Sequence, residues 1–441
     1  MKKEKNKRYD GGITLIALVV TVVVLLILAG VSLNLVIGNE GILTRSKEAV
    51  DKYGKQAENE QQGLDDVEDW MDEQFGGTGM QTVTVNTKAK KNGTINGKEP
   101  NTNNPVIPKG YTPINAGSVA WGDGSSAPTQ SSIDNGLVIK DDNNNEWVWI
   151  PVEASTLSSM YVTSNDGIAL SGDVGVTTKL YTNSTTIGKT GDTVTISRGI
   201  PNTTDYREPD LVTSYDKTES YYKTILGYDT PKAMAEAFTR DYANMINSIK
   251  KYGGFYIGRY ELSNEGVQKG KATLTNTNWY NLYKKCTTLN ASEKVESKMI
   301  WGIQWDLACD FISKKGEQKS IKYSTTWGNY KNSTENAAVM DGETKKYGRK
   351  QVTGFSEYWK ANNIYDLAGN CNEWTQDADN TKYRAYRGGF HGDDGLFIPA
   401  SHRTYCEADY SNGSGKRFSS HFNNKVALGA FNFNCVKSYF I

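Results

Sequence analysis

The sequence has no excess charge of either sign and few cysteines, prolines and histidines. Its 441 residues carry 50 Lys plus Arg and 50 Asp plus Glu, so the formal net charge is zero. Because nucleic-acid binding needs a cationic face against phosphate, this balance argues against a nucleic-acid partner. Five cysteines are too few for a disulfide scaffold. Only ten prolines, together with 11% aromatic residues, argue against a mainly disordered chain.

One long uncharged run lies near the N-terminus. Residues 13–37 span roughly 37 Å as a helix, enough for a hydrocarbon core about 30 Å thick. Residues 1–12 carry five Lys or Arg, whereas residues 39–75 carry eleven acids and four bases. The positive-inside rule therefore predicts a transmembrane helix over 13–37 in a bacterial cell membrane, with the rest of the chain on the extracytoplasmic side.

The junction before this run resembles a type IV prepilin leader. A basic leader at 1–12 ends in Gly12, and Ile13 opens the apolar helix. The resemblance implies that a membrane peptidase cuts between these two residues and that the helix packs with other pilin subunits. The family has Glu at the fifth mature position, whereas this chain has Ala17. Two alternatives therefore stay open: entry into a pilus and an uncleaved signal anchor.

Residues 38–75 read as an amphipathic stalk helix. Apolar residues recur there at alternating spacings of three and four, so a partner helix or the head must cover the stripe. Residues 76–105 are rich in Asn, Thr, Lys and Gly and predict a flexible linker. The positions of the apolar stripe are Leu43, Val50, Tyr53, Ala57, Leu64, Val67 and Met71.

Residues 106–441 predict an α+β head. Short apolar runs at 136–140 and 146–152 read as strands, and a loop-rich insertion covers about 154–228. Thr230 and Pro231 predict the start of a helix that Gly253 ends. A second helix is expected over about 298–313.

Several segments of the head occur in a recognisable order. They resemble the formylglycine-generating-enzyme (sulfatase-modifying factor) branch of the C-type lectin fold, which implies a lectin-like head. The pairing of GN-x-x-EW with RGG is the specific part of the resemblance. The segments are EWVWIPV (146–152), GGFYIGRYELS (253–263), WGIQWDLA (301–308), NIYDLAGNCNEWTQD (363–377), YRAYRGGF (383–390) and PASHR (399–403).

The enzymes of this branch oxidise a substrate cysteine with two copper-binding cysteines placed just after the RGG turn. Here residues 390–402 contain no cysteine. Copper(I) then has no soft ligands and the oxidation has no route, so we expect a head without enzymatic activity and without copper. A formylglycine-generating-type oxidase is the rival interpretation.

The resemblance also implies a structural calcium site around the GN-x-x-EW loop. Carried over by position, its ligands are the side chains of Asp366 and Glu373 and the backbone carbonyls of Gly369 and Cys371. Carboxylates and carbonyls suit a hard cation that prefers oxygen. The alternative is that the two carboxylates only hydrogen-bond the loop backbone.

The variable proteins of diversity-generating retroelements share the lectin-like fold and the RGG landmark. Their C-terminal stretch is mutated at adenines, mostly in AAY codons, which cannot become Trp, Gln, Lys, Glu or Met. Residues 388–441 here contain no Trp, Gln or Met, but three Lys and one Glu, so an ordinary polar loop region is the alternative. Exposed aromatic and polar residues after the RGG turn make a plausible recognition surface. The predicted ligand-binding residues are His391, Asp393, Asp394, Leu396, Phe397, His402, Tyr405, Cys406, Asp409 and Tyr410.

The sequence thus predicts a cell-surface or pilus-associated protein whose head binds an extracellular protein or glycan. A purely structural minor pilin, whose head only shapes a filament, is a further alternative.

Overall fold

A computed structural model describes the chain over twelve ranges. Two units form within it, residues 1–78 and residues 79–441. In the first unit only residues 22–25 are described, and they are helical. The described ranges are 22–25, 80–114, 130–160, 184–197, 218–289, 295–334, 340–341, 344–345, 348–378, 382–409, 425–427 and 429–433.

None of the helices within those ranges has the length and apolar character needed to cross a bilayer. The predicted membrane helix over 13–37 falls outside the described residues except for 22–25, as do the leader over 1–12 and the stalk over 38–75.

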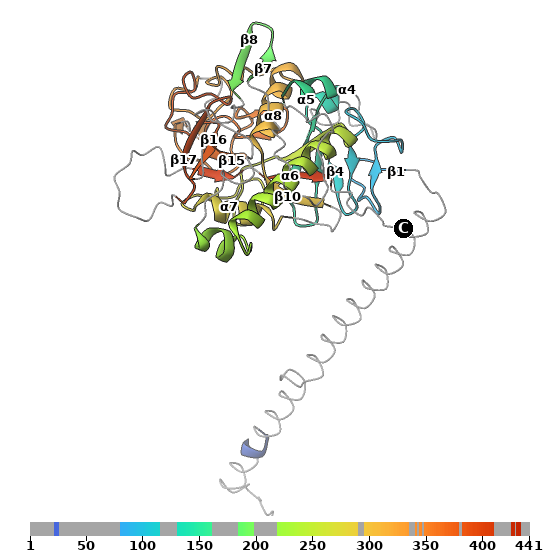
Figure 1. Cartoon of the computed structure of the whole chain (residues 1–441). Helices are drawn as coiled ribbons and strands as arrows, with labels where there is room; N and C mark the ends of the chain where they lie inside the picture. Colours follow the sequence, from blue (N-terminus) through green and yellow to red (C-terminus); the bar gives the residue numbers. More distant parts are fainter. Residues whose placement is uncertain are drawn as a thin grey trace, which may run out of the picture. The chain divides into compact units, whose positions relative to one another are not determined.

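The head is a mixed α+β unit built around a six-stranded sheet (Figure 1). Its strand order is β10-β19-β9-β6-β5-β4, and every neighbouring pair is antiparallel. Strands β5 and β6 fall in the two apolar runs that predicted strands. The six strands are β4 (Thr112–Ile114), β5 (Val138–Lys140), β6 (Glu146–Pro151), β9 (Gly254–Gly258), β10 (Val295–Met299) and β19 (Gly429–Phe433).

A second sheet has four strands in the order β17-β16-β15-β18. Strand β18 is parallel to β15, and the other two pairs are antiparallel. The motif segments with GN-x-x-EW and RGG lie on adjacent strands of this sheet, because β15 begins in the first and β16 ends in the second. The strands are β15 (Asn372–Ala378), β16 (Tyr383–Arg387), β17 (Arg403–Glu407) and β18 (Lys425–Ala427).

The other strands form four small sheets. One has three strands, β1 (Gln81–Thr82), β2 (Gly93–Thr94) and β3 (Val106–Ile107). The three others are the hairpin of β7 (Ser184–Lys189) and β8 (Asp192–Ser197), the pair β11 (Met340–Asp341) and β12 (Thr344–Lys345), and the pair β13 (Lys360–Ala361) and β14 (Ile364–Tyr365).

Residues 80–105, expected to be part of a flexible linker, are folded into the head. Val83, Ala89 and Ile95 are buried in the same hydrophobic cluster as the main sheet. The segment contains few apolar residues, but each of these three packs into the core, so low hydrophobicity alone was a misleading signal there.

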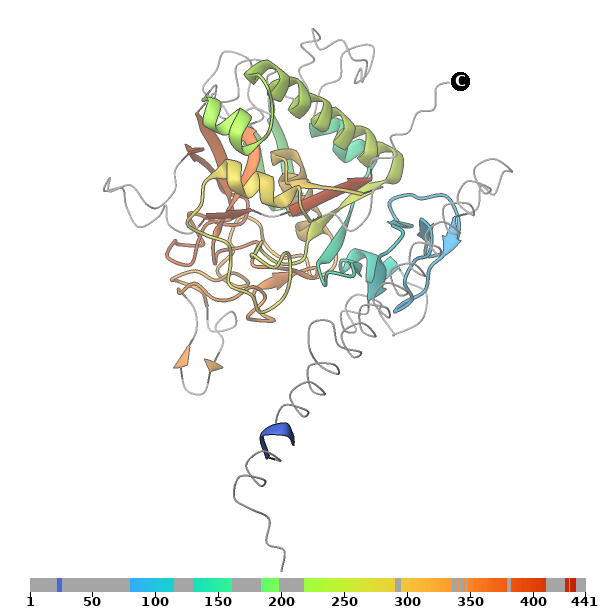
Figure 2. The same ribbon diagram turned by 90° about the horizontal axis from the view of Figure 1, so that it is seen from below.

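The longest helix among the described residues of the head, α6 (Pro231–Tyr252), confirms the predicted start and stop signals. The Thr230 hydroxyl accepts a hydrogen bond from the Ala233 amide at 3.0 Å, and Gly253 ends the helix with a φ of +77°. The buried face of α6 packs on β9 and β19 (Figure 2). The other helices are α4 (Gln130–Asp134), α5 (Ala154–Met160), the π-helix η1 (Ser220–Ile225), α7 (Trp279–Cys286) and α8 (Gly302–Lys314).

The helix expected over 298–313 begins four residues later, as α8. Residues 295–299 form β10 instead, where Val295, Ser297 and Met299 alternate inward and pair with β19. Helix α8 packs against β6 and β15, so it contacts both large sheets. Residues 302–313 are buried throughout, so the polar residues Gln304, Asp306 and Asp310 of α8 face the interior and not solvent.

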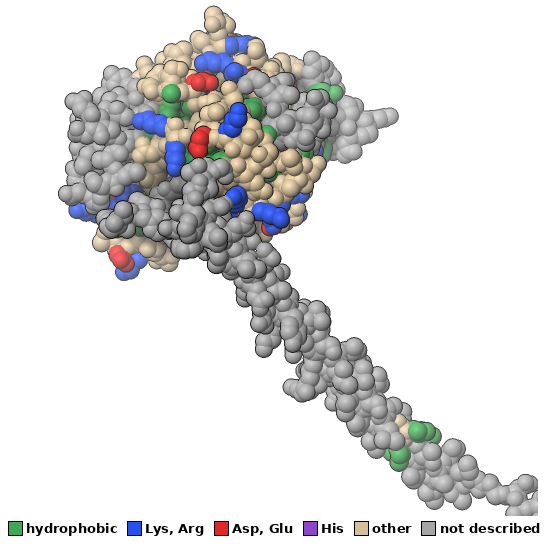
Figure 3. Space-filling model, turned by 90° about the vertical axis from the view of Figure 1, so that its right-hand side faces the viewer, with side chains coloured by type: hydrophobic (Ala, Val, Ile, Leu, Met, Phe, Trp, Pro, Cys, Tyr) green, Lys and Arg blue, Asp and Glu red, His purple; other side chains and the backbone are tan. Residues whose placement is uncertain are grey.

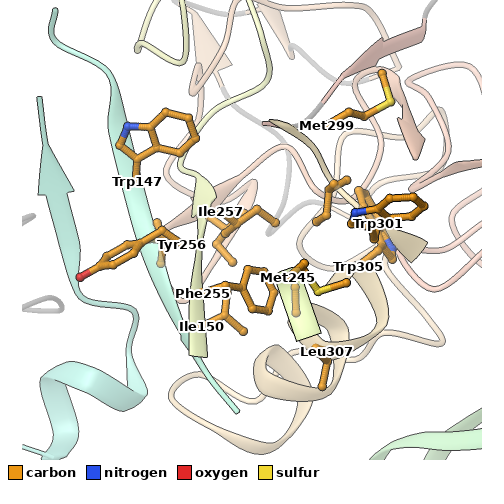
Figure 4. Close-up of a cluster of buried hydrophobic side chains, with 14 of the residues drawn as sticks. Trp147, Ile150, Met245, Phe255, Tyr256, Ile257, Met299, Trp301, Trp305 and Leu307 are labelled. Atoms are coloured by element: carbon orange, nitrogen blue, oxygen red, sulfur yellow. The ribbon is translucent and has the colours of Figure 1, made fainter. Parts of the chain in front are cut away.

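Aromatic and aliphatic side chains fill the space between α6, α8 and the main sheet (Figure 4). Ile150 of β6, Phe255 and Ile257 of β9 and Trp305 of α8 are each at most 1% exposed. Trp147 of β6, also buried, lies on the opposite face of the sheet together with Tyr256 (Figure 4). On the face of the head in Figure 3, Lys and Arg side chains lie among neutral and acidic ones.

Candidate ligand-binding site

Arg387, the last residue of β16, fixes the two ends of the loop that follows it. Its side chain is fully buried, and Nη2 donates to Oδ1 of Asp306 on α8 at 2.5 Å. Its Nε donates to the carbonyl oxygen of His402 at 3.0 Å. One guanidinium therefore ties the loop over 390–402 to the buried helix at both its beginning and its end.

Two glycines turn the chain sharply after this arginine. Gly388 and Gly389 have φ angles of +82° and +75°, which favour glycine. A Cβ on Gly388 would lie 2.5 Å from Oε2 of Glu373, and one on Gly389 would lie 2.7 Å from the carbonyl oxygen of Ile398. The RGG turn therefore depends on both glycines for conformation and for space.

The tip of the loop is held by an amide and a carboxylate. The Asp394 Oδ1 accepts hydrogen bonds from the Leu396 amide at 2.9 Å and from Nδ2 of Asn332 at 2.8 Å. The Gly395 amide donates to Oδ1 of Asn332 at 2.9 Å. On this fixed main chain the side chains of Leu396 and Phe397 remain 47% and 79% exposed.

These two exposed side chains border an open cavity of about 620 Å³. The wall formed by the loop continues into His402 and Arg403, and Lys322 and Tyr323 contribute from a separate segment. Residues 193–196 of β8 form another wall. Tyr323 is also 49% exposed, so an apolar and aromatic rim surrounds a hollow of the size that binds ligands.

Three of the predicted ligand-binding residues line this cavity: Leu396, Phe397 and His402. Asp393 and Asp394 instead hold the loop from within. The Asp393 Oδ2 accepts from the Phe390 amide at 3.1 Å, and this residue is only 4% exposed. Their carboxylates therefore act on the shape of the loop and not directly on a ligand.

Four other predicted residues are not among the residues that line the cavity: His391, Tyr405, Cys406 and Asp409. His391 packs edge-on against the Phe390 ring, with centroids 5.1 Å apart. Tyr405 and Cys406 lie on β17, where Tyr405 is 48% exposed and Cys406 is buried. Asp409 accepts a hydrogen bond from the Tyr221 hydroxyl at 3.2 Å, and Tyr410 is outside the described residues.

His402 lines the cavity with a neutral imidazole. Burial, followed by the charge of Arg387, lowers its pKa to about 4. At neutral pH it therefore offers one donor and one acceptor and no charge.

No pattern in the sequence indicates that Tyr323, Lys322 or β8 belongs to the site. Tyr323 lies between turn residues with no motif around it. The alternation of Thr and apolar residues over 192–197 was readable as a strand, but nothing indicated that this strand lies beside the RGG loop. Their proximity is a tertiary property, created by the packing of the hairpin on α8.

The GN-x-x-EW loop brings together buried carboxylates. Glu373 and Asp366 are 0% and 1% exposed, and the sequence had not indicated a third one, Glu261, which is also fully buried. Glu261 accepts from the Asn370 side chain at 2.6 Å and from the Cys371 amide at 3.1 Å.

The two predicted carboxylate ligands have free oxygens. Within the described residues, neither oxygen of Glu373 and only one of Asp366 accepts a hydrogen bond from another residue. Burial raises the pKa of Asp366 to about 7. Burial and the charges of Glu261 and Asp366 raise the pKa of Glu373 well above its usual range. Buried carboxylates with orphaned oxygens fit a bound cation or bound protons.

This donor set is compatible with calcium only if main-chain oxygens complete it. In the described part of the chain, no three acidic, His or Cys side chains converge as a metal site. The carbonyls of Gly369 and Cys371 would then have to join Asp366 and Glu373, in the hard-oxygen chemistry that calcium prefers.

The four cysteines within the described ranges are buried thiols without disulfide partners there. Burial raises the pKa of Cys286 to about 12 and also raises the pKa values of Cys309 and Cys371. Since the thiolate is the nucleophile and the metal ligand, these three groups are poorly suited to redox chemistry.

No protein-family model matches this chain, and no curated protein matches it either. The interpretation of the site therefore depends on its own geometry.

Proposed function

We propose that this chain is a non-catalytic bacterial cell-surface or pilus-associated protein whose head binds an extracellular ligand in the cavity between β8 and the RGG loop. The observation that carries the proposal is the 79% exposure of Phe397 at the rim of a cavity of about 620 Å³. Large aromatic side chains on a rigid support are typical binding hot spots.

The rigidity of this support favours binding. Arg387 and Asp394 hold the main chain of the loop with buried or partly buried hydrogen bonds, so little main-chain conformational entropy is lost when a ligand binds. The resemblance to the formylglycine-generating branch of the C-type lectin fold, and to retroelement variable proteins, points to the same loop. In this proposal calcium, held by Asp366, Glu373 and two carbonyls, stiffens the neighbouring loop without touching the ligand.

The test uses the purified full-length chain in detergent and an array of immobilised glycans and peptides. We expect the chain to bind at least one class of probe and Phe397→Ala to weaken that binding at least tenfold, the effect of losing about 1.4 kcal/mol. Tyr358→Ala is the matched control, because Tyr358 is 58% exposed but does not line the cavity. Equal binding by the wild-type chain and Phe397→Ala would contradict the proposal.

The oxidase alternative makes a different prediction. A formylglycine-generating oxidase would consume oxygen and oxidise a cysteine-containing peptide when supplied with copper. We expect no such turnover, since residues 390–402 contain no thiol and Cys309, the thiol near Arg387, has a raised pKa. Copper-dependent oxidation of such a peptide would overturn the non-catalytic interpretation.

A further inference from the structure

Strand β8 borders the cavity with its backbone edge. It forms a two-stranded sheet with β7 alone among the described strands. Thr193, Val194, Thr195 and Ile196 all line the cavity. Because successive side chains of a strand point to opposite faces, four consecutive lining residues mean that the cavity runs along the edge of the strand.

Hydrogen-bonded and non-hydrogen-bonded residue pairs alternate along the β7–β8 hairpin, and this alternation shows which amides of β8 face the cavity. The Gly188 amide donates to Oδ1 of Asp310 on α8 at 2.9 Å, so it points away from β8. Gly188 is opposite Thr193 in the antiparallel register, which makes this a pair without mutual backbone hydrogen bonds. The N–H and C=O of Thr193 therefore point away from β7.

Thr195 repeats this orientation two residues later. Its hydroxyl lies 3.2 Å from that of Thr186, as fits the closer side chains of a pair that exchanges no backbone hydrogen bonds. Thr193 and Thr195 thus present their main-chain donors and acceptors toward the cavity. The outer edge of β7 is different, because Asp310 of α8 already occupies it.

The opposite wall supplies apolar contacts and positive charge. Leu396, Phe397 and Tyr323 are the exposed large side chains of that wall. Lys322 is exposed at the cavity and its lining, within the described residues, includes no Asp or Glu. Arg403 also lines the cavity, but its side chain is only 8% exposed and lies 3.7 Å from Oδ2 of Asp377, so its charge is balanced there. A strand placed along β8 would therefore meet apolar side chains on one side and the positive charge of Lys322.

We propose that the cavity binds an extended, acidic peptide segment of a partner protein as a third strand along β8. The proposal rests on the ligand-binding function proposed above and names its chemical class. The six residues of β8 span roughly 20 Å, enough for several main-chain hydrogen bonds, and Phe397 and Leu396 would contact alternate side chains of the peptide.

The first test selects binders to the full-length chain from a displayed library of random twelve-residue peptides. We expect recovered peptides to contain apolar residues at alternate positions and at least one Asp or Glu. Each recovered peptide is then resynthesised with one N-methylated amide at a time. Added-strand binding predicts losses of at least tenfold at every second position and less than threefold at the positions between.

The second test removes an edge donor from the protein. Thr195→Pro deletes an amide that faces the cavity, whereas Thr186→Pro deletes its cross-strand counterpart, which points away from β8. Neither substitution removes a β7–β8 backbone hydrogen bond, so the hairpin is retained in both. We expect Thr195→Pro to weaken peptide binding at least tenfold and Thr186→Pro to change it less than threefold. Lys322→Gln should reduce the preference for acidic peptides.

The outcomes separate this inference from the function on which it rests. Glycan binding that needs Phe397 but is indifferent to Thr195→Pro would overturn the peptide inference and keep the ligand-binding function. Peptide binding without a period of two in the N-methyl scan would also overturn it. Failure of the chain to bind any peptide or glycan would overturn both.

Discussion

Gly388 is the residue on which the turn after β16 most depends. Its φ is +82°, and an added Cβ would lie 2.5 Å from the buried carboxylate of Glu373. We expect Gly388→Ala to lower the free energy of unfolding by about 2–4 kcal/mol, measured by urea denaturation. Gly110→Ala is the control, because Gly110 has a φ of +87° with nothing within 4 Å of an added Cβ, and it should cost about 1 kcal/mol. Equal losses would show that conformation alone matters.

We expect the buried carboxylates to make stability depend on pH and, if the proposed calcium site is occupied, on calcium. The pKa of Asp366 is raised to about 7 in the folded chain, so the protonated form is favoured by folding. Without a cation, the stability that this proton contributes is complete below about pH 4 and is lost as pH rises through 7. Adding calcium should therefore raise the melting temperature more at pH 8 than at pH 5, by several degrees at a hundredfold excess over Kd.

The control for this prediction is Asp366→Asn, which removes the titrating charge. The variant should lose the response of its melting temperature to calcium and the part of the pH dependence between 4 and 7 that Asp366 contributes. An identical calcium response in the variant, or no response in the wild-type chain at pH 8, would contradict a cation at this loop.

The sequence predicts the residues of the buried GN-x-x-EW loop better than it predicts the residues that line the cavity. Asp366, Glu373 and the RGG turn belong to local sequence motifs, and the spacing within these motifs predicts where the residues lie in the fold. Glu261 follows β9 and lies over a hundred residues before Asn370 in the sequence, so no local pattern predicts the contact between them. Exposed residues such as Tyr323 carry even less signal, because nothing in the chain constrains an exposed side chain.

At the scale of elements, substitutions in α6 measure how much its N-terminal cap contributes to the stability of the fold. Thr230→Ala removes the hydroxyl that accepts from the Ala233 amide, and it should cost about 1 kcal/mol of unfolding free energy. Thr239→Ala in the same helix removes only a hydroxyl bonded to the Ala235 carbonyl, so it should change stability by less than about 0.5 kcal/mol. Urea unfolding of both variants, with amide exchange at the first turn of α6, measures the difference.

Elements with clear stop signals were predictable, and elements defined by pairing were not. Helix α6 has a capping threonine, a proline and a terminal glycine in sequence. The boundary between β10 and α8 has no such signal, because Val295–Met299 becomes a strand through pairing with β19, from the far end of the chain. Long-range pairing of this kind leaves little trace in the residues beside it.

At the scale of the whole molecule, the N-terminus and the C-terminus carry separate predictions. If the prepilin resemblance holds, the mature chain begins at Ile13 with a methylated amine. Mass spectrometry of the chain extracted from membranes measures this directly. An intact segment 1–12 would contradict the pilin interpretation and favour an uncleaved anchor.

The 3′ end of the gene tests the resemblance to retroelement variable proteins. Deep sequencing across a population grown from near-identical cells should find substitutions at adenines, concentrated after the codon for Gly389. Substitutions at codons 396 and 397 would then outnumber those at codons 387 and 388, because Arg387 and Gly388 are buried. An invariant 3′ end would favour a fixed adhesin or a structural minor pilin.

In the RGG loop, the residues that hold the main chain differ from the residues whose side chains are exposed, so the exposed positions can be substituted without loss of the loop conformation. Arg387 and Asp394 hold the main chain, while the side chains at 396 and 397 make few contacts with it. Replacing those two side chains should leave the unfolding free energy nearly unchanged. Such a surface can acquire new specificities by single mutations without first gaining stability elsewhere, so the head has the mutational freedom that rapid adaptation to new partners requires.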